Sequence, residues 1–466
     1  MLPRMKYVST RGNAPALEFA EVLTAGLAPD GGLYVPDSLP HFSPKEIADM
    51  AKLSYNDLAY TIMSPFVGDA IVEADFRALI TKAYGTFRHV AIAPLKQFDK
   101  NQFVLELFHG PTLAFKDFAL QLLGRMLDYT ISKRNQKIVI LGATSGDTGS
   151  AAISGCVDSK FIQLFMLFPD GRVTDIQRRQ MTTILAPHIH NIAIAGTFDD
   201  CQNHVKAMFN DAAFLPSHKK VAVNSINWAR IMAQIVYYFW AGVHLGAPHR
   251  PISFSVPTGN FGDIYAGHIA KAMGLPIEKL IVATNRNDIL DRFFKANDYS
   301  QQGVEPSLSP SMDIQISSNF ERLLFDLHKR DGKKVAALME GFKTGGTLKV
   351  EAAVYEAAKE NFLSHKVSDD ETLTTMRDVY GRTQELLDPH TAIGYRAAET
   401  LFPNADYPVV TLATASPAKF RDAAIKAVGF EAPLPPHLKD LMADKERFKQ
   451  LKNDLGDIQK YIAGAA

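Results

Sequence analysis

The sequence predicts an α/β protein in which a mostly parallel sheet is flanked by helices on both faces. From about residue 94 onward, short apolar runs alternate with segments of helix length, an order typical of βαβ units. Two glycine-rich turns directly follow predicted strands, and ligands of such sheets bind in the turns at the carboxyl ends of strands. The predicted strands are 137–141, 161–168, 192–195, 252–256, 281–284 and 409–412.

A separate unit is predicted before this alternating region, over residues 1–93. A turn cluster of Ala, Pro, Asp and Gly at 28–32 precedes the short apolar run 33–36. Apolar residues then recur at helical spacing from about 43 to 84. We therefore expect a small domain of short strands and helices at the start of the chain.

Two segments near the end of the chain depart from the alternating pattern. The stretch 297–318 is polar, contains Pro306 and Pro310, and predicts a long loop. From Lys419 onward the sequence predicts mostly helix, with the final charged segment on the outside. The expected units are an N-terminal domain (1–93), a region of two α/β lobes with the site between them (94–430) and a helical tail (431–466).

Composition and charge argue against nucleic-acid and membrane partners. The chain of 466 residues carries 50 Lys plus Arg and 50 Asp plus Glu, so its formal net charge is zero. Such a chain has no basic field that would gather nucleic acid or an anionic membrane. Residues 1–12 lack the apolar core of a signal peptide, and the most apolar predicted helix, 231–243, is too short to span a bilayer. We expect a cytoplasmic protein.

Cysteine and histidine usage predicts neither a disulfide framework nor a metal site. The two cysteines, Cys156 and Cys201, are far apart and form no C-x-x-C pattern, which indicates free thiols in a reducing compartment. His188 and His190 form an isolated H-x-H with no third ligand nearby in the sequence.

Lys116 is placed at the start of a predicted amphipathic helix. A helix N-terminus carries partial positive charge, which disfavours a cation there, and apolar neighbours favour the neutral amine. A neutral amine is what a lysine needs in order to trap a carbonyl group. Taken alone, the segment fits a surface lysine better. The helical spacing is carried by Phe115, Phe118, Ala119, Leu122, Leu123, Met126 and Leu127.

The first glycine-rich turn, 142–149, follows the strand predicted at 137–141. Its spacing matches neither a P-loop nor G-x-G-x-x-G nor G-x-S-x-G, so nucleotide and serine-hydrolase interpretations fail. What remains is a turn rich in N–H groups and hydroxyls at a helix start, which suits a carboxylate or another small anion. A purely structural turn with Thr or Ser as the helix N-cap fits the pattern equally well.

The second turn, 255–263, again lies between a predicted strand and a predicted helix. Gly259 and Gly262, three residues apart, let the main chain wrap an anion such as a cofactor phosphate at the helix N-terminus. Asp263 would repel that phosphate unless its carboxylate points away. A structural turn with Asp263 as the acid of a helix start remains the alternative.

Two further polar segments complete the candidate site. Thr414 and Ser416 leave the strand predicted at 409–412 on one side, where a hydroxyl could meet a ring nitrogen or cap the following helix. Segment 224–230 precedes the apolar helix 231–243 and contains Asn224, Ser225, Asn227 and Arg230. These residues could bind a substrate phosphate, or they could cap the helix and form an ion pair.

Together and in this order, the segments resemble the threonine synthase family, which belongs to the fold type II pyridoxal-phosphate enzymes. The resemblance covers nearly the whole chain, and its most specific parts are the Phe-Lys-Asp match and the Gly-Asn-Phe-Gly loop. The matching stretches are 7–12, 30–36, 108–117, 143–149, 224–230, 257–263 and 413–420.

The resemblance implies two open, mostly parallel sheets flanked by helices, an N-terminal α+β domain, and pyridoxal 5'-phosphate as cofactor. The implied reaction converts O-phospho-L-homoserine and water to L-threonine and phosphate, by loss of phosphate across Cβ and Cγ followed by addition of water. The implied enzyme is a lyase of threonine biosynthesis that acts as a monomer or homodimer on a small-molecule substrate.

The resemblance also implies a role for each matching residue. Lys116 would form the Schiff base with the cofactor, and Thr414 would face its pyridine nitrogen. Asp147 would contact the phenolic oxygen, although relatives in this fold type often carry Asn there. The cofactor phosphate would be held by Gly259, Asn260, Phe261 and Gly262, with Asp263 at the rim. The substrate carboxylate would meet Thr144, Ser145 and Thr148, and the substrate phosphate would meet Asn224, Ser225, Asn227 and Arg230.

Two other functions fit the same motifs. Another fold type II enzyme, a lyase or β-replacement enzyme acting on a serine or threonine derivative, would share the lysine and the phosphate loop but would not need a second phosphate site. A non-catalytic paralogue would bind phosphorylated metabolites or a protein partner, and retention of Lys116 argues against it.

Overall fold

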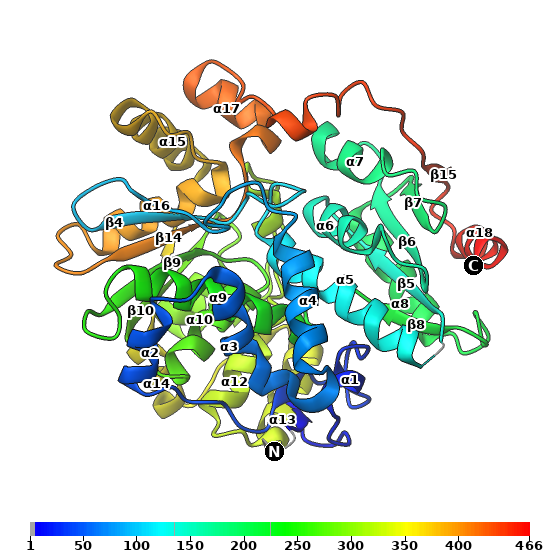
Figure 1. Ribbon diagram of the computed structural model, residues 1–466, viewed down its shortest axis with the longest axis horizontal. Coiled ribbons are helices and arrows are strands. Elements are labelled where there is room, and N and C mark those ends of the chain that lie inside the picture. Colours follow the sequence, from blue (N-terminus) through cyan, green and yellow to red (C-terminus); the bar gives the residue numbers. More distant parts are fainter. Residues whose placement is uncertain (1–4, 135, 224) are drawn as a thin grey trace.

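A computed structural model describes residues 5–134, 136–223 and 225–466, and two open sheets organise this chain (Figure 1). The first sheet has six strands in the order β13-β10-β9-β14-β4-β3, all parallel except β3, which is antiparallel to β4. The second sheet has five parallel strands in the order β15-β7-β6-β5-β8. The predicted α/β fold with two mostly parallel sheets is therefore confirmed.

The strands of the two sheets come from both halves of the chain. The six-stranded sheet consists of β3 (Leu95–Gln97), β4 (Gln102–Glu106), β9 (Ile252–Pro257), β10 (Ile277–Thr284), β13 (Phe362–Lys366) and β14 (Val409–Ala413). The five-stranded sheet consists of β5 (Ile138–Ala143), β6 (Ile162–Pro169), β7 (Ile189–Ile194), β8 (Lys219–Ala222) and β15 (Lys449–Leu451). Two small antiparallel pairs join β1 (Tyr7–Ser9) to β2 (Tyr34–Pro36) and β11 (Tyr299–Ser300) to β12 (Thr347–Leu348).

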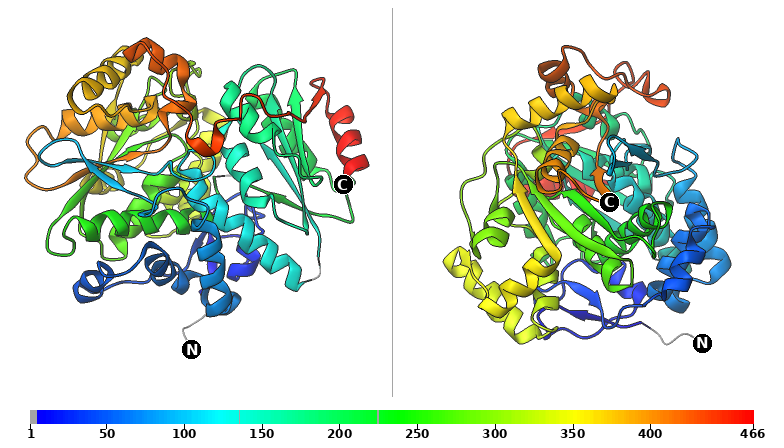
Figure 2. Two further views of the ribbon diagram at one scale, coloured as in Figure 1. Left: turned by 45° about the horizontal axis from the view of Figure 1, so that its top comes forward. Right: turned by 90° about the vertical axis from the view of Figure 1, so that its left-hand side faces the viewer.

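Helices cover both faces of the sheets, as Figures 1 and 2 show. In the first half of the chain they are α1 (Phe19–Val22), α2 (Pro44–Met50), α3 (Tyr55–Val67), α4 (Glu73–Tyr84), α5 (Lys116–Lys133), α6 (Asp147–Cys156), α7 (Asp175–Thr182), α8 (Phe198–Asn210) and α9 (Trp228–His244). They continue with α10 (Gly262–Ala272), α11 (Ile289–Ala296), α12 (Phe320–Leu327), α13 (Gly332–Gly345), α14 (Ala352–Asn361), α15 (Asp369–Thr383), α16 (Pro389–Leu401), α17 (Arg421–Val428) and α18 (Leu455–Ala465). The 3₁₀ turns are η1 (Gly68–Ala70), η2 (Pro310–Met312), η3 (Pro417–Lys419) and η4 (Pro436–Leu438).

Strands buried on both faces account for the apolar runs in the sequence. All six residues of β9 are buried, and five of the six in β5 are. Parallel strands covered by helices on both sides need such continuous apolar sequence. All six predicted strands exist, with boundaries that differ from the prediction by a few residues. The strands β3, β4, β8, β13 and β15, which are short or polar, were not predicted.

Close contact between two helices brings their starting residues together. The backbones of α5 and α6 meet at Gly124 and Gly155, where a Cβ atom on Gly124 would lie 2.3 Å from the Gly155 oxygen. A Cβ atom on Gly155 would likewise lie 2.3 Å from the Leu120 oxygen. Glycine is therefore required on both helices. Each helix begins eight residues earlier, α5 at Lys116 and α6 at Asp147, so the packing sets these two side chains next to each other.

The N-terminal region is bound to the rest of the chain through helices. The pair β1–β2 and helices α2, α3 and α4 form this region, and the helical pattern predicted from 43 to 84 is confirmed. Helix α3 packs on α9, and α4 packs on α5. The N-terminal region therefore supports the outer side of the two helices whose N-termini reach the site.

The loop at 297–318 is mostly irregular, as predicted, and reaches the space between the sheets. It contains only the two-residue strand β11 and the turn η2. The Asp313 carboxylate fixes the loop by accepting hydrogen bonds from Ser307, Asn285 and Asn287 at 2.6, 2.7 and 3.0 Å. This anchoring places Ser311 and Met312 in the wall of a pocket.

The C-terminal tail differs from the helical prediction. In 431–466 the α-helix α18 begins only at Leu455, and β15 extends the five-stranded sheet by pairing in parallel with β7. Buried Ile458 and Ile462 attach α18 to the core of that sheet. Strand β15 is three mainly exposed residues at a sheet edge, so its sequence has no apolar alternation that would identify it.

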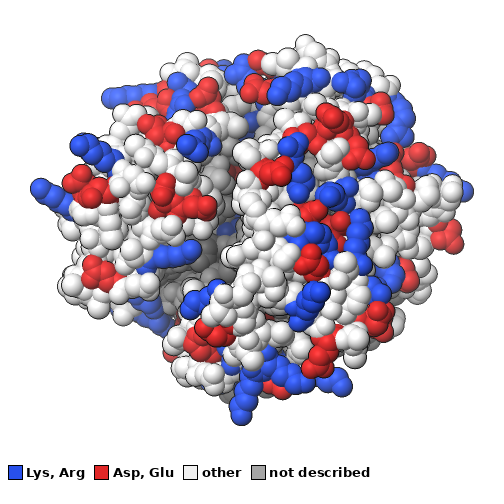
Figure 3. Space-filling view, turned by 180° about the vertical axis from the view of Figure 1, so that it is seen from behind, with Lys and Arg blue, Asp and Glu red and all other residues white. Residues whose placement is uncertain are grey.

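Surface charge is mixed, and the described helices give no membrane span. Lys and Arg side chains are interspersed with Asp and Glu on the face shown in Figure 3, which is hollowed along a groove. No helix in residues 5–134, 136–223 or 225–466 combines the length and apolar composition needed to cross a bilayer.

Candidate active site

A pocket of about 740 Å³, measured out to its open mouth, lies between the two sheets. Its walls come from the turns after β9 and β14, the first turns of α5, α6, α9 and α16, and η2. This is the edge where the carboxyl ends of parallel strands meet, as expected for a ligand site in such a fold. The predicted residues that line it are Lys116, Asp147, Thr148, Ser225, Arg230, Gly259, Asn260, Phe261, Gly262, Asp263 and Thr414.

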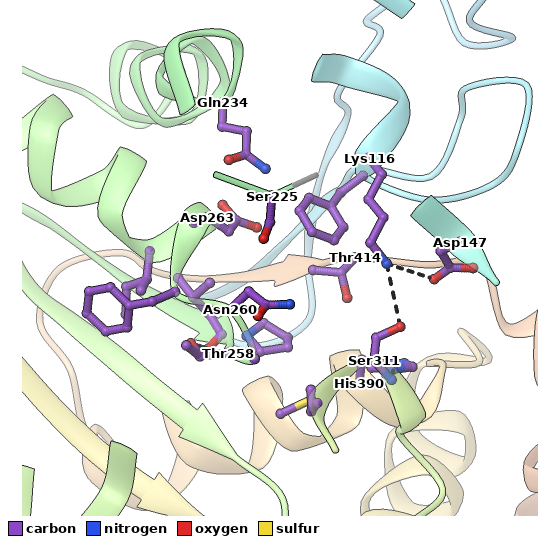
Figure 4. Close-up of a pocket in the computed structure, with 18 of the residues that line it drawn as sticks. Lys116, Asp147, Ser225, Gln234, Thr258, Asn260, Asp263, Ser311, His390 and Thr414 are labelled. Carbon is purple, nitrogen blue, oxygen red and sulfur yellow. Dashed lines mark hydrogen bonds and ion pairs between the residues drawn. The ribbon is translucent and has the colours of Figure 1, made fainter. Parts of the chain in front are cut away.

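Lys116 points into the pocket from the first residue of α5 (Figure 4). Its Nζ lies 3.2 Å from Asp147 Oδ2 and 3.5 Å from the Ser311 hydroxyl. Burial lowers the pKa of the amine below its ordinary value, and the positive charges of Lys419 and Arg230 lower it further against the opposing effect of Asp147. The position therefore shifts the pKa of the amine in the direction that the sequence predicted.

Asp147 is an ionised carboxylate between two lysines. Burial raises its pKa, but the charges of Lys116 and Lys419 outweigh burial and hold the pKa well below its ordinary value. Gln177 Nε2 donates to Oδ1 at 2.8 Å, and Lys419 Nζ lies 2.7 Å from the same oxygen. The carboxylate therefore has a fixed orientation, with Oδ2 directed at Lys116.

The second glycine-rich turn forms an amide-lined cradle opposite the lysine. Helix α10 begins at Gly262, and Phe261 before it has a left-handed backbone with φ 62°. The first N–H groups of a helix have no intrahelical acceptor, so these amides are available to an anion in the pocket. A Cβ atom on Gly259 would lie 2.6 Å from the Ser311 oxygen, so only glycine fits there. Ser311 therefore touches both the cradle and the Lys116 amine.

The Asp263 carboxylate is held by the two tyrosines Tyr237 and Tyr238 of α9. Its Oδ1 accepts from the Tyr237 hydroxyl at 2.5 Å and from the Tyr238 hydroxyl at 3.0 Å. Burial raises the pKa of this carboxyl to about 6, with the tyrosine hydrogen bonds opposing the rise. The repulsion expected between Asp263 and a phosphate is reduced, because the acid is engaged by α9.

Arg230 is a buried cation with an unused donor. It follows Trp228 in the first turn of α9, is 4% exposed and lines the pocket. Its Nη1 has no hydrogen-bond partner within the described part of the chain. Burial lowers its pKa to about 10, so the guanidinium stays charged at neutral pH. A buried charge without full pairing is costly, which points to an anionic ligand.

The hydroxyl of Thr414 also belongs to the pocket, whereas Ser416 has a structural role. Thr414 lines the cavity, and its carbonyl accepts from Phe115 N at 2.8 Å, which ties the end of β14 to the start of α5. The Ser416 hydroxyl accepts from Ala418 N as the cap of η3.

Three of the predicted residues that the structure describes are not found in the pocket wall. The Thr144 hydroxyl accepts from the N–H groups of Gly146 and Gly149 at 2.9 and 2.8 Å, so it shapes the turn. Asn227 caps α9 at Ala229 N and donates to Leu23 O, so its side chain is occupied by structure. Ser145 does not line the pocket either, and Asn224 lies outside the described residues.

Several pocket residues were not predicted from the sequence. Gln234 lies one turn after Arg230 on α9, and Ser311 and Met312 come from the long loop. His390 accepts from Ser311 N through Nε2 at 3.3 Å, while its Nδ1 lies 2.7 Å from Asp388. Gln234 could have been found from its helical spacing to Arg230, whereas the others are brought in only by the tertiary fold.

The groups present fit pyridoxal 5'-phosphate. The cofactor needs an amine for its aldehyde and a site for its phosphate. The pocket supplies both next to Ser311: the Lys116 amine lies at the Ser311 hydroxyl, and the glycine cradle lies at the Ser311 carbonyl. The unpartnered Nη1 of Arg230 adds a second donor for an anion.

Comparisons with known proteins identify the family to which this chain belongs. The family described as "Threonine synthase N terminus" matches residues 6–84, "Pyridoxal-phosphate dependent enzyme" matches 90–342 and "Threonine synthase, C-terminal" matches 391–462. Threonine synthase of Pseudomonas aeruginosa is 58% identical, with 98% of each chain covered, and that of Saccharomyces cerevisiae is 43% identical, with 95% of this chain and 94% of the relative covered. A crystal structure of a PLP-bound threonine synthase from Brucella melitensis superposes with a TM-score of 0.96 at 52% identity over 99% of both chains. The chain described here belongs to the threonine synthase family of pyridoxal-phosphate-dependent enzymes.

Proposed function

We propose that this chain converts O-phospho-L-homoserine and water to L-threonine and phosphate in the pocket between its two sheets. The observation that carries the proposal is the meeting of three groups in one cavity: the Lys116 amine, the amide cradle at 259–262 and the buried, partly unpaired Arg230. A pyridoxal-phosphate enzyme with a phosphorylated substrate needs one amine and places for two phosphates.

The cofactor would be held by residues from both lobes. Lys116 would bind its aldehyde carbon, the amides of Gly259, Asn260, Phe261 and Gly262 would hold its phosphate, and Asp263 would stand at the rim beside its two tyrosines. Thr414 would face the pyridine nitrogen, and Asp147 would face the phenolic oxygen. When bound, pyridoxal phosphate supplies an electron sink that stabilises negative charge on a substrate carbon.

Lys116 is suited to move protons once the substrate amine has taken its place. Burial lowers its pKa, which shifts the amine toward the form that can accept a proton. We propose that it takes the proton from substrate Cα and, once it has released that proton, takes one from Cβ. Asp147 and Ser311 lie on two sides of Nζ and restrict its position. Loss of phosphate from Cγ and addition of water at Cβ then complete the proposed reaction.

The substrate would be oriented by its two ends. We propose that the turn 144–148 receives the carboxylate, with Thr148 in the pocket wall and the buried Thr144 holding the shape of the turn. The substrate phosphate would meet Arg230 and Ser225, with Gln234 as an additional donor from the same helix. Arg230 favours a phosphorylated substrate over the serine and threonine derivatives used by other enzymes of this fold.

The test compares three substrates on the purified full-length protein. Phosphate release from O-phospho-L-homoserine should be rapid and should yield L-threonine, while turnover of O-acetyl-L-serine and L-threonine should be slight. The protein should also be yellow and change its absorbance when O-phospho-L-homoserine is added. Preferred turnover of O-acetyl-L-serine would assign it to another reaction of the fold, and a colourless protein that binds no cofactor would indicate a non-catalytic role.

We also propose a cytoplasmic location, a monomer or homodimer as the working state, and a division into units at 1–93, 94–430 and 431–466. Cys156 and Cys201 are both buried and unbridged, which supports a reducing compartment. Fractionation and light scattering of the native protein would test location and assembly.

A further inference from the structure

Lys419 is a fully buried lysine next to the pocket. Its side chain is 0% exposed, and it comes from η3, just after β14. Lysines are seldom fully buried unless they are paired. The Nζ of Lys419 lies 2.7 Å from Asp147 Oδ1 and donates to the Thr112 carbonyl at 2.7 Å. Lys419 does not line the pocket, so it acts on the site only through its neighbours.

The two contacts of Lys419 join the segments that carry the reactive lysine and its acid. Asp147 opens α6, and its other oxygen faces Lys116 Nζ at 3.2 Å. Thr112 lies in the turn before α5, where its N–H and hydroxyl both donate to Asp117 at 2.8 Å. The Lys419 ammonium therefore connects the first turn of α6 to the turn that leads into α5.

Charge in this region is arranged around Asp147. One carboxylate oxygen faces Lys419 and the other faces Lys116, so a single negative charge is shared by two cations. Lys116 would leave this arrangement on binding the cofactor. Among the described residues Lys419 forms its ion pair with Asp147, and the buried carboxyl of Asp117 also interacts with its charge. The charged or titratable groups that surround or lie behind the Lys116 amine are Asp147 (α6), Lys419 (η3), Arg230 (α9), Asp263 (α10), His390 (α16) and Asp117 (α5), whose pKa burial raises to about 6.

We propose that Lys419 is a positioning residue that holds Asp147 against Lys116 through one carboxylate oxygen and, by its own positive charge, favours the unprotonated Lys116 amine. When two cations share one carboxylate, each cation weakens the attraction between the carboxylate and the other cation. Lys419 would thus keep Asp147 ionised and fixed while leaving Lys116 free to give up its proton. This inference rests on the proposed role of Lys116.

The test removes the charge of Lys419 and follows Lys116 directly. In full-length protein freed of cofactor, the rate at which an amine-acylating reagent labels Lys116 is measured against pH by peptide mass spectrometry. Only the neutral amine reacts, so the midpoint of the profile reports its proton affinity. Lys419→Gln keeps a donor for the Thr112 carbonyl but has no charge, and we expect its midpoint at higher pH and several-fold slower labelling at neutral pH.

A second readout uses the enzyme loaded with pyridoxal phosphate. The pH at which its visible absorbance titrates should rise in Lys419→Gln for the same electrostatic reason. Lys220→Gln is the matched control, because Lys220 likewise donates to backbone carbonyls, those of Met208 and Asp211, and does not line the pocket. It should leave both midpoints at their wild-type values. Lys419→Met, which is apolar and unbranched, replaces the Gln variant if that variant does not fold.

The outcomes separate this inference from the proposed function. A lower unfolding temperature with an unchanged Lys116 labelling midpoint would show that Lys419 only supports structure, and the inference would be wrong. A shift in Lys220→Gln equal to that in Lys419→Gln would also overturn it. Failure of the proposed function would appear instead in the wild type, as absence of cofactor binding or of phosphate release.

Discussion

At the scale of single residues, Lys116 is the group whose removal should have the largest effect. Lys116→Ala should lower turnover of O-phospho-L-homoserine by about 10³-fold or more, since it removes the amine that binds the cofactor and moves protons. Reduction of the loaded wild type with borohydride should fix the cofactor on the peptide that carries Lys116. The measurement is peptide mapping by mass spectrometry together with steady-state kinetics.

The exposed Lys137→Ala variant serves as the control for Lys116→Ala, because Lys137 lies outside the pocket at the start of the segment leading into β5. It should keep both turnover and the labelled peptide. A fixed cofactor on any lysine other than Lys116 would show that the site has been placed wrongly.

Arg230 should show opposite effects on stability and on binding. Its Nη1 is buried without a partner in the described chain, so Arg230→Met removes a costly group and should leave the thermal unfolding midpoint unchanged or higher when no anion is present. Binding of inorganic phosphate should weaken by about 10- to 150-fold, because a hydrogen bond to a charged group is worth about 1.5–3 kcal/mol. Thermal shift measurements with a phosphate titration test both effects.

A purely structural Arg230 would give a different result. In that case Arg230→Met would lower the unfolding midpoint without changing the response to phosphate. Gln234→Leu, one turn later on the same helix face, provides a comparison in which a neutral pocket residue is lost. Its effect on phosphate binding should be smaller than that of Arg230→Met, because no charge is removed.

At the scale of elements, the contact between α9 and α10 contains the buried acid Asp263. Its pKa is raised from 3.8 to about 6, so the folded protein holds this proton more tightly than the unfolded chain. The contribution of this group to stability is therefore complete below about pH 4 and is lost as pH rises through 6. A shift of two units corresponds to about 3 kcal/mol.

Asp263→Asn tests this linkage, because the amide oxygen can still accept from Tyr237 and Tyr238 while the group no longer titrates. The free energy of unfolding of the variant, relative to wild type, should rise by up to about 3 kcal/mol between pH 4 and pH 7. Urea unfolding at several pH values measures it. Asp406→Asn, at an exposed position, should show no such trend, and a flat difference for Asp263→Asn would contradict the assignment.

The elements that the sequence predicts best are those whose residues face one kind of environment. Strands β5 and β9 are apolar along their whole length, and α9 is buried on nearly every side, so their patterns are plain. Strand β8 begins with two lysines and β13 ends in His-Lys, which hides both among polar segments. Their place in a sheet depends on hydrogen bonds to neighbouring strands rather than on their own composition.

The same distinction applies to the candidate site. Lys116 and the Gly259–Gly262 turn could be recognised because their local sequence places an amine and free amides at helix starts. Ser311 and His390 are brought to Lys116 by a long loop and by α16, which no local pattern announces. Thr144 and Asn227 have side chains that suit a ligand, but in the folded chain they satisfy backbone groups instead.

At the scale of the whole molecule, Arg322 links the N-terminal region to the pocket. Its guanidinium is fully buried and donates to the Tyr34 carbonyl at 2.8 Å and to the Ile226 carbonyl at 2.6 Å. Tyr34 belongs to β2. Ile226 directly follows Ser225, and Ser225 lines the pocket. Neighbouring Glu321 binds Arg11 and Thr10 from the same region. The N-terminal region therefore sets the position of the segment that leads into α9.

Arg322→Met should consequently affect both folding and substrate binding. A hydrogen bond from a charged group is worth about 1.5–3 kcal/mol, and the variant loses those that Arg322 donates, so the free energy of unfolding should fall by several kcal/mol. Because the chain at 225–226 loses its anchor, KM for O-phospho-L-homoserine should rise more than kcat falls. Arg330→Met is the matched control: Arg330 also binds the N-terminal region, through the Pro36 carbonyl, but among the described residues its hydrogen bonds go to Pro36 and Asp326 and not to 225–227. Arg330→Met should lower the free energy of unfolding and leave KM near the wild-type value. Equal changes of KM in Arg322→Met and Arg330→Met would contradict the prediction, because they would show that the N-terminal region acts on the pocket through overall stability and not through Arg322.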